Sequence, residues 1–403
     1  MSHLSRIVIV GASLAGQRAA RAFRSAGFSG ELTLVGEERH APYNRPPLSK
    51  SVLRGEIGLS EIALERNKDS LDAKWRLGTR ATHLNIEKQT INLESGESLR
   101  FDAALIATGV SARRLEIPGT DLDGVHYMRT FDDAERLRAA LKTASSVLII
   151  GAGFIGCEVA ASAVHMGLAV TIVDPAVVPM GRVLGVQLGL AAQRLHEGHG
   201  VRFLMGRSVV ALKGQHAVTA GLLDNGELVA ADVVVVGIGS IPNTNWLKGS
   251  GIERSNGVHC DETCLVPGTH GRIAAAGDVA NWPHASYGGV RMRVEHWSQA
   301  AEQGEAAALA LLNPYHARPF APTLSMWSDQ YGKKIQAIGA PWLGDRLHIQ
   351  EGTVDSCKFA AQAYLGQQLV GAVLFAMPSR MASYRNRLEQ AIAERKPQRQ
   401  ANA

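Results

Sequence analysis

The sequence predicts an α/β protein with two doubly wound parallel sheets and a C-terminal α+β domain, and three observations support this fold class. Short apolar runs alternate with helical patterns over most of the chain. Two of these runs, at residues 7–10 and 147–150, lead directly into glycine-rich turns at residues 11–16 and 151–156. From residue 324 onward the pattern changes to short alternating segments separated by glycines. Alternating strands and helices are typical of parallel sheets, whereas closely spaced strand patterns are typical of antiparallel ones.

The first strand–helix–strand unit lies at the start of the chain. Strands are expected at residues 7–10 and 32–35, with a helix at about 14–25 that Gly27 ends. A further buried strand is expected at residues 103–107, where it stops at Thr108-Gly109.

The second unit repeats this order. Strands at residues 147–150 and 170–173 flank a helix from about 154 to 166. Two later strand patterns, at residues 232–239 and 273–276, resemble closing strands of the first sheet.

These elements predict three domains. The first is discontinuous, from 1–108 and 232–313, and it ends with an alanine-rich helix at about 298–312. The second, 109–231, is inserted into it. The third, 314–403, is expected to hold a small antiparallel sheet at 324–375 and a helix near 381–394.

Composition argues against several classes of protein. Hydrophobic residues make up 46% and charged residues 20% of the chain, which favours large cores over disorder. Aromatic residues are only 5%, so an aromatic nucleic-acid platform is not indicated. The net charge is +5, which fits either a mildly basic soluble protein or a basic patch for an acidic protein partner. The basic cluster near the C-terminus is interpreted as a solvated helix and tail. We expect no nucleic-acid partner.

The cysteine pattern predicts neither a metal site nor an iron–sulfur cluster in this chain. Its four cysteines include no CxxC pair, and Cys260 and Cys264 form a lone CxxxC. We interpret that pair as ordinary reduced cysteines rather than a redox couple, which suits a cytoplasmic protein. No signal peptide and no apolar run of membrane-spanning length are present in the sequence, so we expect no membrane association.

The glycine-rich turns match the Rossmann dinucleotide-binding fingerprint. They read Gly11-Ala12-Ser13-Leu14-Ala15-Gly16 (the first glycine turn) and Gly151-Ala152-Gly153-Phe154-Ile155-Gly156 (the second glycine turn). In this motif the first glycine makes a tight turn, the second admits the pyrophosphate, and the third lets helix pack on strand. Ser13 departs from glycine at the second position, although its small hydroxyl could donate to a phosphate. Two such turns predict two dinucleotides, as in hydride transfer from a nicotinamide to a flavin.

An acidic residue follows the second strand of each unit, where the motif places a ligand for ribose hydroxyls. Glu37 follows the strand at 32–35, and Asp174 follows the strand at 170–173. A carboxylate at Asp174 would repel a 2′-phosphate, and the nearest following cation is Arg182, so NADH is predicted over NADPH. A glycine turn of this kind can also bind nothing, but two turns with acidic partners argue against that alternative.

Glu158 lies two residues after the last glycine of the second glycine turn. One interpretation is a favourable interaction with the N-terminus of its helix. The other is a hydrogen bond near the nicotinamide.

Further motifs extend this pattern to most of the chain: Pro42-Tyr43-Asn44-Arg45-Pro46-Pro47-Leu48-Ser49-Lys50, Ala107-Thr108-Gly109, Gly237-Ile238-Gly239 with Pro242-Asn243, Gly277-Asp278, and Trp327-Ser328-Asp329-Gln330. With them, residues 5–375 resemble the FAD-dependent NADH:ferredoxin reductases that serve aromatic-ring dioxygenases and bacterial cytochromes P450. The resemblance implies a glutathione-reductase-like fold, in which the first predicted domain binds FAD and the second binds NADH.

The resemblance also implies roles for single residues. Arg45 and Lys50 would lie beside the flavin, with Lys50 and Glu158 as the catalytic residues; Trp327 would lie near the flavin or the acceptor. The implied FAD-binding residues are Gly11, Ser13, Leu14, Ala15, Gly16, Glu37, Arg45, Lys50, Ala81, Ala107, Thr108, Gly109, Arg129, Gly277, Asp278 and Trp297. The predicted NADH-binding residues, which follow mainly from the second glycine turn and its surroundings, are Gly151, Gly153, Ile155, Gly156, Glu158, Asp174, Arg182 and Gly239. Structural alternatives remain open: Lys50 could cap a helix, Asp278 could be an N-cap, and the tryptophans could be core residues.

The expected activity is electron transfer from NADH through FAD to a separate, acidic [2Fe–2S] ferredoxin, by a monomer or weak homodimer that is one component of an oxygenase system. Two alternatives stay open: an NADH oxidase or diaphorase that uses oxygen or a quinone, and a non-enzymatic nucleotide sensor. A disulfide reductase would need cysteine near residues 40–50, and that stretch has none.

Overall fold

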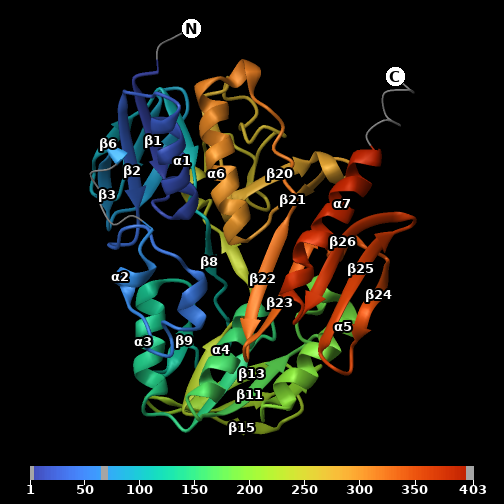
Figure 1. Cartoon of the computed structure of the whole chain (residues 1–403). Coiled ribbons are helices and arrows are strands. Elements are labelled where there is room, and N and C mark those ends of the chain that lie inside the picture. Colours follow the sequence, from blue (N-terminus) through green and yellow to red (C-terminus); the bar gives the residue numbers. More distant parts are fainter. Residues whose placement is uncertain (1–3, 65–70, 396–403) are drawn as a thin grey trace. The chain divides into compact units, whose positions relative to one another are not determined.

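The computed structural model describes residues 4–64 and 71–395, which form two compact units (Figure 1). The first unit comprises Met1–Asn44, Leu59–Ser111 and Ile241–Pro322. The second unit comprises Arg45–Gly58, Ala112–Ser240 and Thr323–Ala403. The division of the chain into three domains stays a prediction. Each unit contains one of the two glycine turns.

A parallel sheet in the order β19-β7-β1-β2-β3 forms the core of the first unit. Its strands are β1 (Arg6–Val10), β2 (Glu31–Gly36), β3 (Lys74–Leu77), β7 (Ala103–Ile106) and β19 (Ile273–Ala275). Strands β1, β2, β7 and β19 are almost wholly buried because their residues are nearly all apolar, whereas the edge strand β3 is exposed or half-buried. The strands predicted at 7–10, 32–35, 103–107 and 273–276 are confirmed.

Helices α1 (Leu14–Ser25) and α6 (Trp297–Leu312) pack against each other beside this sheet (Figure 1). They approach closely at Gly304, where an added Cβ would lie 2.3 Å from the Ala15 carbonyl oxygen. The contact between the backbone of Ala15 and Gly304 of α6 therefore fixes the start of α1, which overlaps the end of the first glycine turn.

Smaller elements complete the first unit. They are the antiparallel strands β4 (Ala81–Asn85), β5 (Thr90–Leu93) and β6 (Ser98–Arg100), the strands β18 (Val258–His259), β20 (Ala280–His284) and β21 (Val290–Met292), and the short helices α2 (Leu59–Ile62), η3 (Asn245–Leu247), η4 (Gly277–Val279), η5 (Ala285–Tyr287) and η6 (Pro314–His316). Short strands β8 (Val110–Ala112) and β17 (Ser240–Pro242) occur where the chain passes between the units.

A second parallel sheet, in the order β12-β11-β10-β16-β9, forms one core of the second unit. Its strands are β9 (Val125–Tyr127), β10 (Ser146–Ile150), β11 (Ala169–Asp174), β12 (Arg202–Met205) and β16 (Val233–Val236), and its helices are α3 (Phe131–Leu141), α4 (Phe154–His165) and α5 (Gly181–Glu197). Strands β13 (Val209–Gly214), β14 (Val218–Leu223) and β15 (Leu228–Ala230) form an antiparallel sheet that shares its apolar core.

The assignment of the strand at 232–239 to the first sheet was wrong. Residues Val233–Val236 form β16, which pairs with β10 in register Val147↔Val233. Both sheets need a fully buried parallel strand beside the strand that enters the glycine turn, and four successive valines suit either place. The pattern therefore predicted the strand correctly but not its sheet.

An antiparallel sheet in the order β22-β23-β26-β25-β24 forms the C-terminal part of the second unit. Its strands are β22 (Ser325–Gln330), β23 (Lys333–Gly339), β24 (Arg346–Thr353), β25 (Lys358–Leu365) and β26 (Gln368–Phe375), followed by α7 (Met381–Arg395); the remaining short helices are η1 (Pro46–Ser49), η7 (Pro341–Leu343) and η8 (Pro378–Arg380). One face packs on α5 and the other on α7, as Figure 1 shows. The predicted sheet and terminal helix are confirmed.

Candidate functional site

The first glycine turn is shaped by close backbone contacts in the first unit. Gly11 has φ +121°, and a Cβ there would lie 2.0 Å from the Ala107 carbonyl oxygen. A Cβ on Gly16 would lie 2.0 Å from the Gly11 carbonyl oxygen. Ser13 is the extended N-cap residue of α1, so Leu14 and Ala15 begin the helix. Only glycine fits the two ends of this turn, which presents a helix N-terminus suited to a phosphate.

A second turn, at Gly277-Asp278, lies beside the start of α1. Gly277 has φ +77°, and a Cβ added to it would lie 3.0 Å from the Ala15 Cβ. The Gly277 N–H donates to Gln303 Oε1 at 2.9 Å, so α6 holds this turn in place. Asp278 lies within η4 and is half-buried, so the N-cap interpretation does not hold. No sequence pattern predicts a role for Gln303, which is fully buried.

The Ala107-Thr108-Gly109 motif is linked to Asn243 by several hydrogen bonds. Thr108 Oγ1 donates to the Asn243 carbonyl at 2.8 Å, and Asn243 Nδ2 donates to the Thr108 carbonyl at 2.9 Å. The Asn243 N–H donates to the Gly109 carbonyl at 3.0 Å. Two motifs that lie far apart in sequence therefore form one structure in the first unit.

The end of β2 carries Glu37, whose side chain is exposed and pairs with Arg80. The segment before β4 is anchored to the same place, because the Thr79 N–H donates to the Gly36 carbonyl at 3.1 Å. Ala81, the first residue of β4, directly follows Arg80. Because Arg80 pairs with Glu37, Ala81 lies in the segment held beside Glu37. Arg80 was missed, since no local pattern links it to Glu37.

Trp297 begins α6 and is only half-buried, so the interpretation as a core residue does not hold. Its Nε1 donates to Asn44 Oδ1 at 2.8 Å, and the Arg18 guanidinium lies 5.9 Å from the centre of its ring. Trp327, on β22 of the second unit, is likewise half-buried.

The second glycine turn repeats the geometry of the first in the second unit. Gly151 has φ +109°, and its added Cβ would lie 2.3 Å from the Gly237 carbonyl oxygen; on Gly156 it would lie 2.1 Å from the Gly151 carbonyl oxygen. Gly153 differs, because a Cβ there would meet no described atom within 4 Å. Open space thus lies at the position where this motif admits a pyrophosphate.

Two further residues of the predicted NADH set are accessible. Ile155, in the first turn of α4, is 46% exposed. Gly239 has φ +102° with open space around it, and its carbonyl accepts a hydrogen bond from the Arg113 N–H at 2.9 Å.

Asp174, at the end of β11, is bonded to the second glycine turn. Its Oδ2 accepts from the Ala152 N–H at 2.7 Å, and its Oδ1 accepts from the Ala176 N–H at 2.7 Å. A carboxylate has about four lone-pair sites, so both oxygens can still accept from ribose hydroxyls.

Arg207, which no sequence pattern singles out, follows β12, the strand that pairs with β11. The Arg207 N–H donates to the Asp174 carbonyl at 3.2 Å, and the Gly206 N–H donates to the Ala176 carbonyl at 2.9 Å. The Arg207 guanidinium lies 3.9 Å from Asp224 Oδ1 and is half-exposed. Arg207 follows β12 rather than β11, so only the fold places it beside Asp174.

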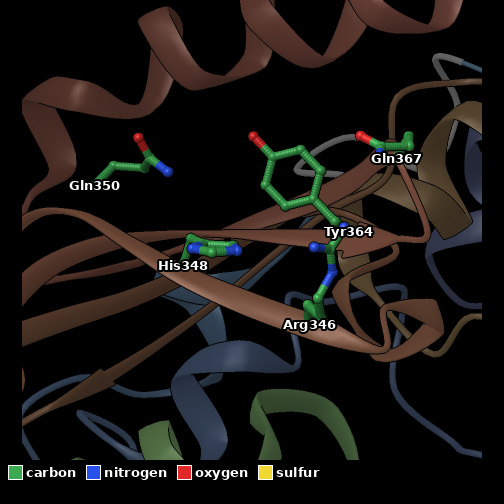
Figure 2. A pocket seen from close by; sticks show the side chains of 5 residues that line it. All are labelled: Arg346, His348, Gln350, Tyr364 and Gln367. Atoms are coloured by element: carbon green, nitrogen blue, oxygen red, sulfur yellow. The ribbon is translucent and has the colours of Figure 1, made fainter.

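Arg182 is exposed at the start of α5, where it lines a hollow of about 210 Å³ with residues of η7 and β24, including Trp342. Another hollow, of about 240 Å³, lies on the C-terminal sheet (Figure 2). Its lining is polar: Arg346, His348, Gln350, Tyr364 and Gln367. Both are smaller than usual ligand pockets, and the second contains none of the predicted site residues.

A buried ion pair joins the two predicted catalytic residues. Lys50 Nζ lies 2.6 Å from Glu158 Oε2, and their side chains are 17% and 6% exposed. Ser49 Oγ donates to the same Oε2 at 2.6 Å, and Ser328 Oγ donates to Oε1 at 2.6 Å. Glu158 lies beyond the first turn of α4, so its interpretation as a partner of the helix N-terminus was wrong.

Arg45 and Arg129 are also brought together in the second unit. Arg45 Nη1 donates to the Arg129 carbonyl at 2.8 Å. The capping box of α3 fixes this carbonyl, because Asp133 Oδ2 accepts from the N–H groups of Arg129 and Thr130 at 3.1 and 2.9 Å.

The four cysteines are buried and form no disulfide. Burial raises the pKa of the Cys260 thiol to about 12 and that of the Cys157 thiol further still. Neither is therefore a thiolate near neutral pH. Among the described residues there is no cluster of side chains suited to a metal ion, and no helix combines the length and apolar character needed to cross a membrane.

The chain matches known protein families over nearly its whole length. Residues 5–304 match the family described as pyridine nucleotide-disulphide oxidoreductase, and residues 325–403 match the reductase C-terminal family. The rhodocoxin reductase of Rhodococcus erythropolis is 36% identical, over 91% of this chain and 85% of its own length. The ferredoxin–NAD(+) reductase component of the biphenyl dioxygenase system of Paraburkholderia xenovorans is 38% identical, over 83% of this chain and 81% of its own.

A solved structure supports the same relationship. The reductase chain of the covalent putidaredoxin reductase–putidaredoxin complex superposes with a TM-score of 0.89 at 30% identity, over 97% of this chain and 93% of that one. The predicted resemblance and fold class are confirmed.

Proposed function

Because the chain belongs to the pyridine nucleotide-disulphide oxidoreductase family, we propose that it is a flavoprotein reductase that passes electrons from NADH through FAD to a separate [2Fe–2S] ferredoxin of an oxygenase system. The observation that carries this proposal is the pair of glycine turns, each closed by a backbone approach that only glycine allows. The similarity to ferredoxin reductase components over most of the chain supports a ferredoxin as the acceptor. The proposal also includes a cytoplasmic location, an acidic ferredoxin as the partner, and a monomer or weak homodimer as the oligomeric state.

The first unit would hold FAD. The first glycine turn presents the N-terminus of α1 to the pyrophosphate, and Glu37 would accept from the adenosine ribose, with Ala81 near the adenine. The Gly277-Asp278 turn, fixed by Gln303, would hold the ribityl chain. Bound FAD would supply the two-electron and one-electron chemistry that side chains lack.

The second unit would hold NADH. Gly153 leaves room for the pyrophosphate, and Asp174 would accept from the ribose hydroxyls while it braces the turn. The Lys50 ammonium, fixed by Glu158, would place positive charge where hydride transfer increases electron density. The protein's main contribution would be positioning, because this reaction needs little acid–base catalysis.

Replacing Asp174 by asparagine should lower the preference for NADH over NADPH. The neutral amide accepts fewer hydroxyl hydrogen bonds and no longer repels a 2′-phosphate, and the backbone of Arg207 is bonded to that of Asp174. We expect the NADH/NADPH ratio of kcat/KM to fall by about tenfold or more, or ~1.4 kcal/mol. Asp355→Asn, at an exposed aspartate, is the control and should leave the ratio unchanged. Equal kcat/KM for NADH and NADPH in the unaltered protein would contradict this assignment.

The rate of ferredoxin reduction should decrease with salt. The chain carries a net charge of +5, which would attract an acidic partner at long range. Raising the salt from ~0.01 M to ~1 M shrinks the screening length from about 30 Å to about 3 Å. We expect a fall of at least several-fold in the bimolecular rate, while the reduction of bound flavin by NADH alone changes much less. A bimolecular rate that stays constant over this range would rule out a basic docking patch.

Two simple observations test the flavoprotein proposal itself. The purified protein should carry a yellow cofactor, and anaerobic NADH should bleach its absorbance. A colourless protein would contradict the flavoprotein proposal, and a yellow protein that NADH does not bleach would favour a non-enzymatic nucleotide sensor.

A further inference from the structure

The Lys50–Glu158 pair is the end of a longer buried hydrogen-bond chain inside the second unit. Ser328 Oγ, which donates to Glu158, accepts from Gln330 Nε2 at 3.0 Å. Gln330 Oε1 lies 2.9 Å from His196 Nε2, and His196 Nδ1 lies 3.0 Å from the Tyr331 hydroxyl. Ser328, Gln330 and His196 are each at most 1% exposed. This hydrogen-bond chain thus links α4, β22 and the end of α5.

The proton positions along this chain follow from its two ends. A carboxylate only accepts, so Ser328 donates to it and must accept from the Gln330 amide N–H. The Gln330 carbonyl then needs a donor, which is His196 Nε2–H. His196 Nδ1 is left as an acceptor for the Tyr331 hydroxyl. Every donor points toward Glu158, and His196 must be the neutral Nε2–H tautomer.

The hydrogen-bond chain lies on one face of β22, and the predicted site residue Trp327 lies on the other face. Ser328 and Gln330 alternate with Trp327 and Asp329, so the two pairs face opposite sides of the strand. Ser328 and Gln330 are buried, whereas Trp327 and Asp329 are half-buried. Both buried residues are polar at positions where a strand that packs on a helix usually carries apolar side chains. Their polarity therefore requires an explanation beyond packing.

Tyr331, at the end of the hydrogen-bond chain opposite Glu158, lies in a strained turn. Tyr331 and Gly332 connect β22 and β23 with φ of 51° and 71°. A two-residue turn of this kind favours asparagine and glycine, and tyrosine is unusual there. The Tyr331 ring stacks on His199 with centres 3.9 Å apart, while its hydroxyl reaches His196. These contacts hold the hydroxyl at the start of the chain.

We propose that Ser328, Gln330 and His196 are positioning residues for the Lys50–Glu158 pair. Ser49 and Lys50 both bind Oε2, so Ser328 is the partner that fixes Oε1 and prevents rotation of the carboxylate. Gln330 and His196 in turn fix the Ser328 hydroxyl. This inference rests on the proposed function, because it gives the chain the task of holding Lys50 in place for hydride transfer. Ser328 and Gln330 of the C-terminal sheet thereby help to position an ion pair between Lys50, which directly follows η1, and Glu158 of α4.

The first test is the rate at which bound flavin is reduced at saturating NADH in Ser328→Ala and Gln330→Leu. A misplaced charge slows a positioned reaction, so we expect a loss on the order of tenfold in this rate, with flavin content unchanged. Ser383→Ala on α7 and Gln350→Leu on β24 are matched changes at exposed positions and should react like the unaltered protein. A rate in Ser328→Ala equal to that of Ser383→Ala would overturn the proposal.

The second test is a double-mutant cycle between Ser328→Ala and Glu158→Gln. Because Ser328 acts through Glu158, adding Ser328→Ala to Glu158→Gln should produce little further loss of rate. The same non-additivity should appear in the denaturation midpoints of the purified proteins, a measurement that does not depend on catalysis. Additive effects in both measurements would show that Ser328 stabilises the fold independently of Glu158.

The third test reads the chain directly. Imidazole nitrogen NMR near neutral pH should show His196 as the neutral Nε2–H tautomer, and Gln330→Leu should alter its shifts. A protonated ring or the Nδ1–H tautomer would overturn the chain as drawn. The flavin measurements separate the two proposals. Failure of NADH to bleach the unaltered protein contradicts the proposed function, whereas bleaching of Ser328→Ala at the rate of the unaltered protein contradicts the positioning role.

Discussion

Replacing Lys50 by methionine is expected to lower the free energy of unfolding by about 3 kcal/mol. The change removes the cation 2.6 Å from Glu158 Oε2 and leaves a carboxylate that is only 6% exposed. Losing one partner of a buried ion pair is costly because the remaining charge has been withdrawn from water. Ser49 and Ser328 still donate to Glu158, so the loss should fall at the low end of the usual range. Urea denaturation followed by circular dichroism measures it.

The double variant Lys50→Met/Glu158→Leu separates stability from function. With both charges removed, most of the lost stability should return, because apolar side chains of similar size often replace a buried ion pair without loss. The reduction of bound flavin by NADH should stay slow, because the positive charge is still missing. A double variant as unstable as Lys50→Met would show that the loss comes from packing. If the double variant reduced flavin at the normal rate, the positive charge of Lys50 would not be needed for hydride transfer, and Lys50 would not belong to the proposed site.

Replacing Gly153 by valine is expected to raise KM for NADH by about tenfold or more, or ~1.4 kcal/mol, without unfolding the protein. Gly153 has φ −77° and ψ −179°, which any residue adopts, and open space surrounds its Cβ position. In the complex, that space should be occupied by the pyrophosphate. Steady-state kinetics with ferricyanide as acceptor, together with thermal unfolding, measure the two effects separately.

Gly151→Ala is the contrasting variant in the same turn. It should reduce the yield of folded protein, because the added Cβ would lie 2.3 Å from the Gly237 carbonyl oxygen at a φ of +109°. If Gly153→Val left KM for NADH unchanged, the second glycine turn would not be the NADH site. If Gly151→Ala folded normally, the backbone approach would not be needed for this turn.

Local patterns were sufficient to predict the two strand–helix–strand units and the C-terminal sheet, but not the helices α3 and α5 or the sheet formed by β13, β14 and β15. The helix at 14–25 was predicted with the bounds that α1 has, because an apolar strand, a glycine turn and Gly27 mark both of its ends. The strand at 232–239 was placed in the wrong sheet, because a run of buried valines carries no information about its neighbours. Register and sheet membership depend on contacts between distant segments.

The candidate site was predicted only in its individual parts. Lys50 and Glu158 were both singled out, but their pairing and the participation of Ser328 require η1, α4 and β22 to meet in three dimensions. Arg80 and Gln303 were missed for the same reason, since their partners Glu37 and Gly277 lie far away in sequence. Motif spacing identifies residues that bind a shared ligand; it does not reveal the residues that hold them in place.

The central claim is that a ferredoxin accepts the electrons that NADH delivers. Stopped-flow mixing of the NADH-reduced protein with an oxidised [2Fe–2S] ferredoxin, with oxygen or with a quinone tests it most directly. We expect flavin reoxidation by the ferredoxin to be at least an order of magnitude faster than by either small acceptor at equal concentration, with matching loss of the ferredoxin's visible absorbance. Rapid reoxidation by oxygen or the quinone, with no acceleration by any [2Fe–2S] ferredoxin tried, would contradict the claim and identify an NADH oxidase or diaphorase.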